Sequence, residues 1–309
     1  MVSTIIETHN LTRRFGERTA VEALTLQVRA GEVFALLGPN GAGKTTAVRM
    51  LACLIAPTSG TATVLGQDVT TGAERIRAGV GLLTESPGLY DRLSAWQNLL
   101  LFARLYGVSK PASQVEKYLR LLDLWERRDD PTGGFSKGMK QKVAIARALL
   151  HEPELVFLDE PTSGLDPSAA HAMRDFLEQI KAAGHTIFLT THNLDEAERL
   201  ADRVGILKTR LIALDTPDAL RHRLFGRRTV IGLAEPDPVL VEVASGLPFV
   251  RHASAQDGRL LVDLGDPDEE NPALVAALVQ AGALIRSVVE ERASLEDIYL
   301  QLVDESGSS

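Results

Sequence analysis

Short runs of apolar residues recur along the first two thirds of the chain, and each run is followed by a different kind of residue. Val33–Leu37 precedes a glycine, Leu155–Leu158 precedes two acids, and Thr186–Thr190 precedes a threonine and a histidine. Runs that are apolar throughout, without alternation, are typical of strands buried on both faces of a parallel sheet. Because helical patterns separate these runs, residues 1–220 are predicted to form an α/β domain around a largely parallel sheet.

Residues 87–150 follow a helical period instead. Ser94 is followed by Gln97, and Ser113 by Glu116, and both pairs have the spacing of a capping box at the start of a helix. Apolar residues recur at helical spacing after each box. The segment is therefore predicted to be a helical insertion within the α/β domain.

The pattern changes again after Gly226. Asp257-Gly258 between two apolar runs is a hairpin signal. The order of strands and helices, βαββαβ, predicts a small ferredoxin-like second domain over residues 226–309. The predicted elements are, in chain order, strand Thr229–Leu233, helix Pro238–Ser245, strands Phe249–Ala253 and Arg259–Leu264, helix Pro272–Gln280, strand Leu284–Val289 and a last helix from Ser294.

The composition is that of a globular protein. The chain has 309 residues, 45% hydrophobic and 24% charged, which is long enough for two domains. The net charge of −8 is uneven, because residues 226–309 contain 6 Lys and Arg against 15 Asp and Glu. An acidic C-terminal part would repel phosphates, so no nucleic acid is expected as a partner.

Two further features bear on location. Cys53 is the only cysteine, so a disulfide framework is ruled out and a reducing cytoplasm is expected. No apolar stretch reaches the ~18 residues that a membrane span needs, and the first residues lack a signal pattern. We therefore expect a cytoplasmic protein that reaches the inner face of a membrane only through a partner.

A glycine-rich loop follows the first of the buried strands. Residues Gly38–Thr45 match the pattern G-x-x-x-x-G-K-[ST] between a predicted strand and a predicted helix, which is the context that this phosphate-binding motif requires. The glycines let backbone N–H groups surround phosphate oxygens, Lys44 can reach the β- and γ-phosphates, and the Thr45 hydroxyl can bind Mg²⁺. The residues predicted to bind ATP here are Gly38, Pro39, Asn40, Gly41, Ala42, Gly43, Lys44, Thr45 and Thr46.

Two acids follow the second buried strand. In a P-loop fold this strand, Leu155–Leu158, is expected beside Val33–Leu37, so that Asp159 would lie near the Mg²⁺ and belong to the nucleotide site. Glu160, one residue on, can orient or deprotonate the attacking water. Exposed acids at a strand end are the alternative for such a pair, but the upstream phosphate loop favours the catalytic interpretation.

Together with these motifs, the string Phe135–Gln141 resembles the signature of the ABC transporter ATPases, and the resemblance extends over residues 1–220. Ser136 can cap the helix that follows and present its N-terminal amides to a phosphate. Ser163–Asp166 is similar to the family's D-loop. In this family both elements act on ATP held by a second subunit, so the resemblance implies a dimer of two ATPase subunits, identical or not. The residues that it implies act in trans are Ser136, Lys137, Gly138 and Asp166.

The resemblance assigns three further residues. His192 matches the switch histidine that senses the γ-phosphate, and the end of a strand in an open α/β sheet is where ligands bind. Phe15 lies where the family has an aromatic residue that stacks on adenine, with a core phenylalanine as the alternative. Glu85 takes the position of the Q-loop glutamine and, as a carboxylate, can still bind Mg²⁺ or hold the water. The implied catalytic residues are Glu160, His192 and Glu85, and the metal ligands Thr45, Asp159 and Glu85.

The signature departs from its common form, with Lys137 and Met139 where Gly and Gln are usual. These forms occur in the drug-resistance-type exporter ATPases, which the chain most resembles and which often end like Ser294–Leu300. The resemblance implies ATP and Mg²⁺ as cofactors and a separate transmembrane permease as partner, and hence export of a drug-like, lipid or peptide substrate. A non-transport ABC ATPase and a regulatory module that binds nucleotide without turnover are the alternatives.

Overall fold

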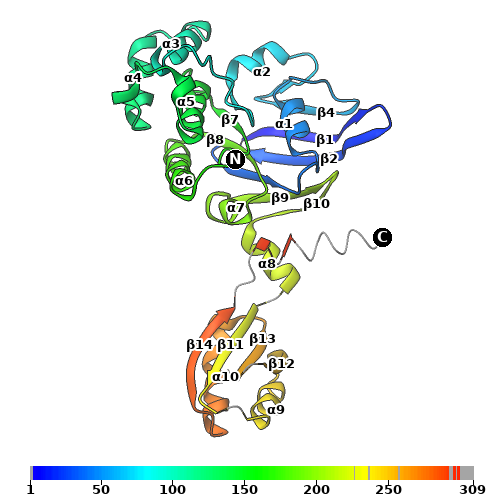
Figure 1. Cartoon of the computed structure of the whole chain (residues 1–309). Coiled ribbons are helices and arrows are strands. Elements are labelled where there is room, and N and C mark those ends of the chain that lie inside the picture. Colours follow the sequence, from blue (N-terminus) through cyan, green and yellow to red (C-terminus); the bar gives the residue numbers. More distant parts are fainter. Residues whose placement is uncertain are drawn as a thin grey trace. The chain divides into compact units, whose positions relative to one another are not determined.

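The chain forms two compact units, the first ending at Thr216 and the second beginning at Pro217 (Figure 1). The sequence pattern predicts a boundary between residues 220 and 226, whereas the structure assigns the helix that starts at Pro217 to the second unit. No helix among the described residues is both long and apolar enough to cross a membrane. The computed structural model describes residues 3–225, 227–235, 237–256, 258–291, 295–296 and 298–299.

The first unit is built on a six-stranded sheet with the strand order β10-β9-β3-β8-β7-β6. Neighbouring strands are parallel except β10, which runs antiparallel to β9. Every residue of β3, β7 and β8 is buried, which confirms that the three apolar runs are interior strands. The strands are β3 Val33–Leu37, β6 Val80–Leu83, β7 Leu155–Asp159, β8 Thr186–Thr191, β9 Arg203–Lys208 and β10 Arg210–Asp215.

The strand order corrects one expectation. Strand β7 does not run beside β3, because β8 lies between them and pairs with both. The carboxyl ends of parallel strands still lie along one edge of the sheet, so the acids after β7 and the loop after β3 both reach that edge. The connection between them runs across β8, where the Thr190 hydroxyl donates a hydrogen bond to Asp159.

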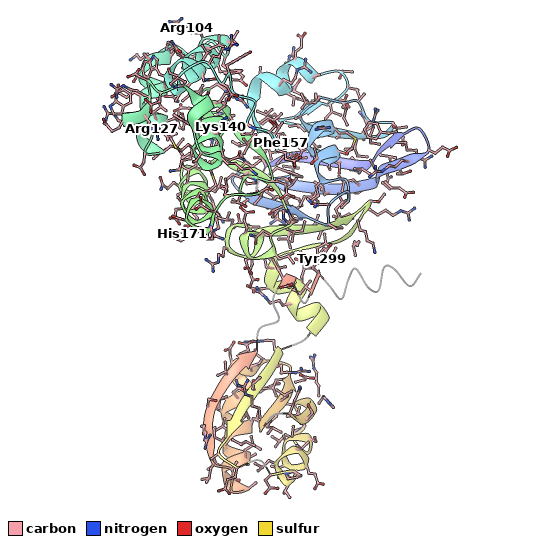
Figure 2. All side chains as sticks on the ribbon, in the orientation of Figure 1. Arg104, Arg127, Lys140, Phe157, His171 and Tyr299 are labelled. Carbon is pink, nitrogen blue, oxygen red and sulfur yellow. The ribbon has the colours of Figure 1, made fainter. Side chains whose placement is uncertain are left out.

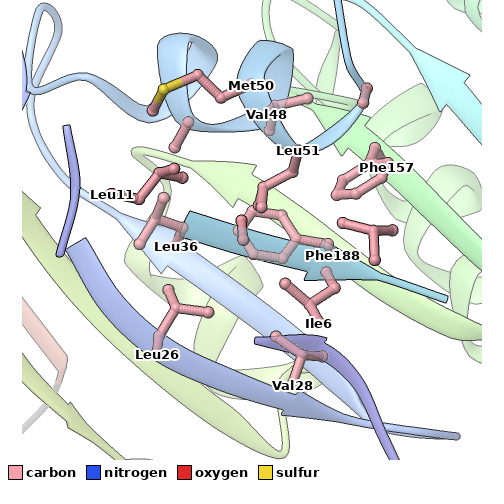
Figure 3. Packing of buried hydrophobic residues seen from close by; sticks show 14 of the residues in the cluster. Ile6, Leu11, Leu26, Val28, Leu36, Val48, Met50, Leu51, Phe157 and Phe188 are labelled. Atoms are coloured by element: carbon pink, nitrogen blue, oxygen red, sulfur yellow. The ribbon is translucent and has the colours of Figure 1, made fainter. Parts of the chain in front are cut away.

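A second, antiparallel sheet with the order β2-β1-β4-β5 completes the first unit, and the apolar runs along the chain do not predict it. Helix α1 contacts strands of both sheets, so it is buried on two sides. Figure 3 shows Leu51 of α1, Phe188 of β8 and Ile6 of β1 in the resulting apolar cluster. The strands are β1 Thr4–Phe15, β2 Arg18–Arg29, β4 Ser59–Val64 and β5 Gln67–Asp68.

Helices α3, α4 and α5 form the predicted insertion between β6 and β7 and gather at one side of the first unit (Figure 1). Helix α3 begins as predicted: the Ser94 hydroxyl accepts a hydrogen bond from the Gln97 N–H (3.1 Å), and the Gln97 side chain accepts one from the Ser94 N–H (3.0 Å). The helices of this unit are α1 Lys44–Leu51, α2 Ala73–Gly79, α3 Ala95–Leu105, α4 Pro111–Leu121, α5 Lys137–Leu149, α6 Pro167–Ala182 and α7 Leu194–Leu200, with short 3₁₀ helices at Trp125–Arg127 and Thr132–Gly134.

The second predicted capping box is wrong. Helix α4 begins at Pro111, after Lys110, and Ser113 lies inside its first turn rather than at its cap. Proline has a fixed φ that suits the first helical position and no N–H to leave unpaired there. The helix therefore starts two residues before Ser113.

The second unit confirms the predicted βαββαβ order. Its strand order is β12-β13-β11-β14 with antiparallel neighbours throughout, as in ferredoxin-like folds. Ile231 and Leu260 of the sheet and Leu240 and Leu274 of the helices lie in one buried apolar cluster. The elements are α8 Pro217–Phe225, β11 Arg227–Leu233, α9 Val239–Ser245, β12 Val250–Gln256, β13 Arg259–Leu264, α10 Pro267–Gln280 and β14 Ile285–Glu291.

One helix boundary in this unit differs from the prediction. Helix α10 begins at Pro267 rather than at Pro272, which lies inside the helix. Asp266 caps the helix, accepting a hydrogen bond from the N–H of Asp268 at 3.2 Å, so the start signal that the pattern assigned to the second proline belongs to the first. The predicted helix start at Ser294 and the first residue of the hairpin signal, Asp257, lie outside the described residues.

Candidate nucleotide-binding site

The glycine-rich loop joins β3 to α1, as its motif predicts. Gly43 has φ 106°, in the left-handed region, and a Cβ there would lie 2.3 Å from the carbonyl oxygen of Ala20. A Cβ at Gly38 would lie 2.3 Å from the carbonyl oxygen of Leu207. The loop can therefore follow this path only with glycine at both positions.

Lys44 is held inward at the first residue of α1. It is 5% exposed, and its ammonium group donates to the carbonyl oxygens of Gly38 (2.7 Å) and Pro39 (3.3 Å). The same group forms an ion pair with Glu160 at 3.2 Å, and both side chains are largely buried. A buried cation whose partners in the described part of the chain are two carbonyl oxygens and one carboxylate is placed to bind an anion that enters the loop.

Thr45 and Asp159 bring α1 and the end of β7 together. The Thr45 hydroxyl donates to the Asp159 carboxylate at 3.2 Å, and Asp159 is 2% exposed. A hydroxyl and a carboxylate at this separation are the oxygen donors that Mg²⁺ prefers, and Mg²⁺ takes its remaining ligands from water and substrate phosphates. The residues present therefore fit a magnesium ion bound together with a phosphate.

Glu160 and His192 form a second pair at the same edge of the sheet. The Glu160 carboxylate lies 2.7 Å from Nδ1 of His192, which is half exposed. Glu160 has φ 53°, a left-handed conformation that costs a non-glycine residue of order 1–3 kcal/mol. Its N–H donates to the carbonyl oxygen of Thr190 at 3.0 Å, so neighbouring structure holds this strained backbone in place.

Lys44, Thr45, Glu160 and His192 line one cavity of about 550 Å³. Phe15 and Glu85 lie in its wall, and Phe15 is 47% exposed, so it is not a core phenylalanine. Gly38 and Asp159 are the two predicted cis residues that do not line the cavity, because both are buried behind it. The lining residues are Phe15, Arg18, Ala20, Pro39, Asn40, Gly41, Ala42, Gly43, Lys44, Thr45, Thr46, Glu85, Glu160, Ser163 and His192.

Three lining residues are absent from the sequence-based site. Arg18 and Ala20 lie on β2, whose pairing with β1 brings them back beside Phe15. The sequence signal was the alternation of apolar and polar residues over 24–28 in β2, which marks that segment as a strand, whereas β1 has no such alternation. Ser163 belongs to the D-loop string, and its position three residues after Glu160 could have marked it.

The residues expected to act in trans lie outside this cavity. Ser136 caps α5, accepting a hydrogen bond from the N–H of Met139 at 3.3 Å, and Asp166 caps α6 in the same way through Ala169 at 2.9 Å. The ammonium group of Lys137 lies against Gly164, where a Cβ would be 2.2 Å from it. Both helix starts thus carry their amides and the Lys137 charge on the surface, where Ser136 and Asp166 are exposed.

Family comparisons agree with this arrangement. Residues 21–163 match the family described as ABC transporter. Residues 216–303 match a second family, described as ATP-binding protein DrrA1-3-like, C-terminal domain. The two matches fall on the two units of the fold.

Curated relatives match nearly the whole chain at 36% identity. The Nod factor export ATP-binding protein I of Burkholderia lata aligns over 96% of each chain. The bacitracin transport ATP-binding protein BcrA of Bacillus licheniformis aligns over 98% of each. The daunorubicin resistance ATP-binding protein DrrA3 of Streptomyces coeruleorubidus aligns over 98% of this chain and 96% of its own.

Solved structures match about 70% of the chain. A structure described as the ATP binding subunit of an ABC transporter has a TM-score of 0.66 and 37% identity, covering 72% of this chain and 94% of that one. The ADP conformation of an ATP-binding cassette has a TM-score of 0.63 and 26% identity, covering 70% and 92%.

Proposed function

Because this chain belongs to the ATP-binding proteins of the ABC transporters, we propose that its cavity hydrolyses Mg²⁺-bound ATP to drive a separate exporter permease. The observation that supports the proposal most directly is the convergence at one sheet edge of Lys44, the Thr45–Asp159 pair and the Glu160–His192 pair. Phosphoryl transfer requires a cation that neutralises the phosphates, a metal site and a base that activates water. These three groups can supply them in that order.

Lys44 changes partners when ATP binds in this proposal. Its ammonium group contacts two carbonyl oxygens and Glu160, and a β,γ-phosphate offers it stronger, doubly charged partners. The exchange also removes the cation from Glu160, which then has only His192 as an ionic partner among its described contacts. Binding of a triphosphate therefore leaves Glu160 free to accept a proton from water.

The Thr45 hydroxyl and the Asp159 carboxylate would hold the magnesium ion, with Glu85 at the cavity wall as a further carboxylate. When bound, this ion neutralises charge on the phosphate oxygens. Glu160 orients the attacking water and takes its proton, while His192 fixes the Glu160 carboxylate and reaches toward the γ-phosphate. The adenine ring stacks on the exposed face of Phe15.

A second ATPase subunit, identical or different, completes each site in this proposal. Ser136, Lys137, Gly138 and Asp166 line no part of their own cavity, but they present helix N-terminal amides and a cation at the surface. Such amides and charges bind phosphate. Closure of two subunits over two ATP molecules, and reopening after hydrolysis, would be the mechanical output.

The helical insertion is the part that we propose contacts the permease. Figure 2 places Arg104 and Arg127 on this insertion, which also exposes several large apolar side chains, and aromatic and arginine side chains are enriched at protein interfaces. Such docking would place the chain at the cytoplasmic face of the membrane. Export, rather than import, follows from the names of the relatives. The exposed apolar residues are Tyr90, Leu101, Leu105, Tyr106 and Leu121.

The decisive experiment compares phosphate release by wild type and Glu160→Gln with excess MgATP. We expect the rate to fall on the order of 10²–10³-fold while ATP binding is kept, because the amide cannot accept the proton of water. The matched control is Glu154→Gln, an exposed carboxyl before β7, which should leave the rate unchanged. A wild-type protein that binds ATP without releasing phosphate would instead favour the regulatory module.

A further inference from the structure

Glu196 is a buried carboxyl group that the catalytic scheme above does not use. It lies in the first turn of α7 and is fully buried, and neither of its carboxylate oxygens has a hydrogen-bond partner among the described residues. An ionised carboxylate in such a place loses its hydration without replacement, which is costly. This carboxyl group therefore needs an explanation.

Its surroundings disfavour a negative charge. Burial raises the pKa of the Glu196 carboxyl, and the charge of Glu160 raises it further. The hydroxyls of Thr191 and Thr162 lie close enough to lower the pKa of Glu196, as does the guanidinium of Arg174, but neither hydroxyl makes a hydrogen bond of ordinary geometry to the carboxyl group. Burial is the largest contribution. Arg174, on α6, has a buried Nε that itself lacks a partner among the described residues.

The position of Glu196 connects it with both residues of the catalytic pair. On one side, the Thr191 hydroxyl accepts from the N–H of Asn193 (3.0 Å), and the Asn193 side chain accepts from the N–H of Glu196 (3.1 Å). These two bonds brace the turn that carries His192. On the other side is Thr162, two residues after the strained Glu160.

We propose that Glu196 is a positioning residue, which as an uncharged acid packs beneath the turns that carry Glu160 and His192 and fixes their separation. The inference rests on the proposed function, because it assigns those two residues to hydrolysis. Ionisation would place a second negative charge beside Glu160 and would bury an anion that lacks hydrogen-bond donors.

The charged groups around Glu196 define the alternative. Glu160 acts on it from the end of β7 and Arg174 from α6, and Glu160 is itself paired with Lys44 and His192. If Glu196 were ionised, Arg174 would be its partner, and the residue would be one half of a buried ion pair. The substitution Glu196→Gln separates an uncharged Glu196 from an ionised one. Its neutral amide can take the place of an uncharged carboxyl group, but it cannot supply the negative charge of an ion pair with Arg174.

The first readout is hydrolysis by Glu196→Gln and Glu196→Ala between pH 6 and 9. We expect Glu196→Ala to lower kcat on the order of 100-fold with little change in KM, because a small misplacement of catalytic groups costs about that much. Glu196→Gln should recover most of this loss and should lack any fall in kcat that wild type shows as its Glu196 ionises. Equal loss in both variants would overturn the proposal in favour of the ion pair.

The second readout, thermal unfolding without nucleotide, needs no hydrolysis. A raised pKa in the folded state costs wild type stability as the pH rises above the ordinary value of 4.5. The melting temperature of Glu196→Gln minus that of wild type should therefore be smallest below pH 4.5, increase with pH, and level off above the raised pKa. A difference that stays flat with pH would contradict an uncharged Glu196.

Asp195→Asn is the matched control, because it removes an exposed carboxyl from the same turn of α7. It should show neither the loss of kcat nor the pH-dependent difference in melting temperature. If wild type itself released no phosphate, the proposed function would fail, whereas the thermal comparison would still decide whether Glu196 is uncharged.

Discussion

The two units of this chain both place helices against a sheet, but they use polar residues differently. In the first unit Lys44 and Asp159 are both buried: Lys44 lines the cavity, and Asp159 lies behind it and accepts a hydrogen bond from Thr45 in the cavity wall. In the second, Thr229 is the one fully buried polar side chain among the described residues, and the partly buried Arg227 pairs with carboxylates such as Glu290. Polar groups thus converge at one cavity in the first unit, whereas in the second they mainly form ion pairs between neighbouring elements.

Sheet topology accounts for much of this difference. Parallel strands end along one edge, so the residues after them converge there. The antiparallel strands of the second unit end alternately at opposite edges, so the residues after them are separated. A cavity of about 530 Å³ exists in the second unit as well, but its charged residues Asp237, Glu242 and Arg259 are exposed, and no ion pair joins them within the described part of the chain. Volume alone therefore does not make a catalytic site.

The largest effect that can break this comparison is Leu274→Ala in the second unit. Leu274 is fully buried in the apolar cluster of that unit, and such a substitution costs about 2–5 kcal/mol of folding free energy. We expect a lower unfolding midpoint by denaturant titration and unchanged phosphate release at 25 °C. Leu284→Ala, at a 63% exposed leucine, is the control and should change neither. If Leu274→Ala also lowered the rate of hydrolysis, the second unit would contribute to the site in the first unit, which would contradict the difference described above.

A smaller effect sharpens the comparison within the first unit. Ser94→Ala removes the capping box of α3 and should cost about 1 kcal/mol of stability. Ser113→Ala, in the first turn of α4, should change stability by a few tenths of a kcal/mol at most, because its side chain caps nothing. Denaturant titration of both variants measures the difference, and equal costs would contradict the assigned helix starts.

Local patterns predicted the parts of the fold that depend on local physics. Burial and capping act over a few residues, so the sequence could predict three features of the fold. These are the apolar runs of β3, β7 and β8, the capping box at Ser94 and the βαββαβ order of the second unit. The sequence did not predict which strands are neighbours. Strand β8 separates β7 from β3, and the β2-β1-β4-β5 sheet joins segments far apart in sequence, such as those of Ile6 and Val64. Such pairings depend on tertiary packing.

The candidate site divides in the same way. Motif residues such as Lys44 and Thr45 were predictable because their spacing follows from phosphate geometry. Arg18 and Ala20 were missed because they reach the cavity through strand pairing. Glu196 was missed because nothing in its local sequence separates a buried glutamate in a helix from an exposed one. Its role follows only from the burial that tertiary structure imposes.

The central claim is that Lys44 holds the nucleotide's phosphates, and equilibrium binding of MgATP to Lys44→Ala tests it most directly. We expect the dissociation constant to rise on the order of 100-fold, because the variant removes the buried cation and leaves Glu160 without its ammonium partner. Lys110→Ala, at an exposed lysine before α4, should bind as wild type does. A Lys44→Ala protein that bound MgATP as tightly as the parent would contradict the account.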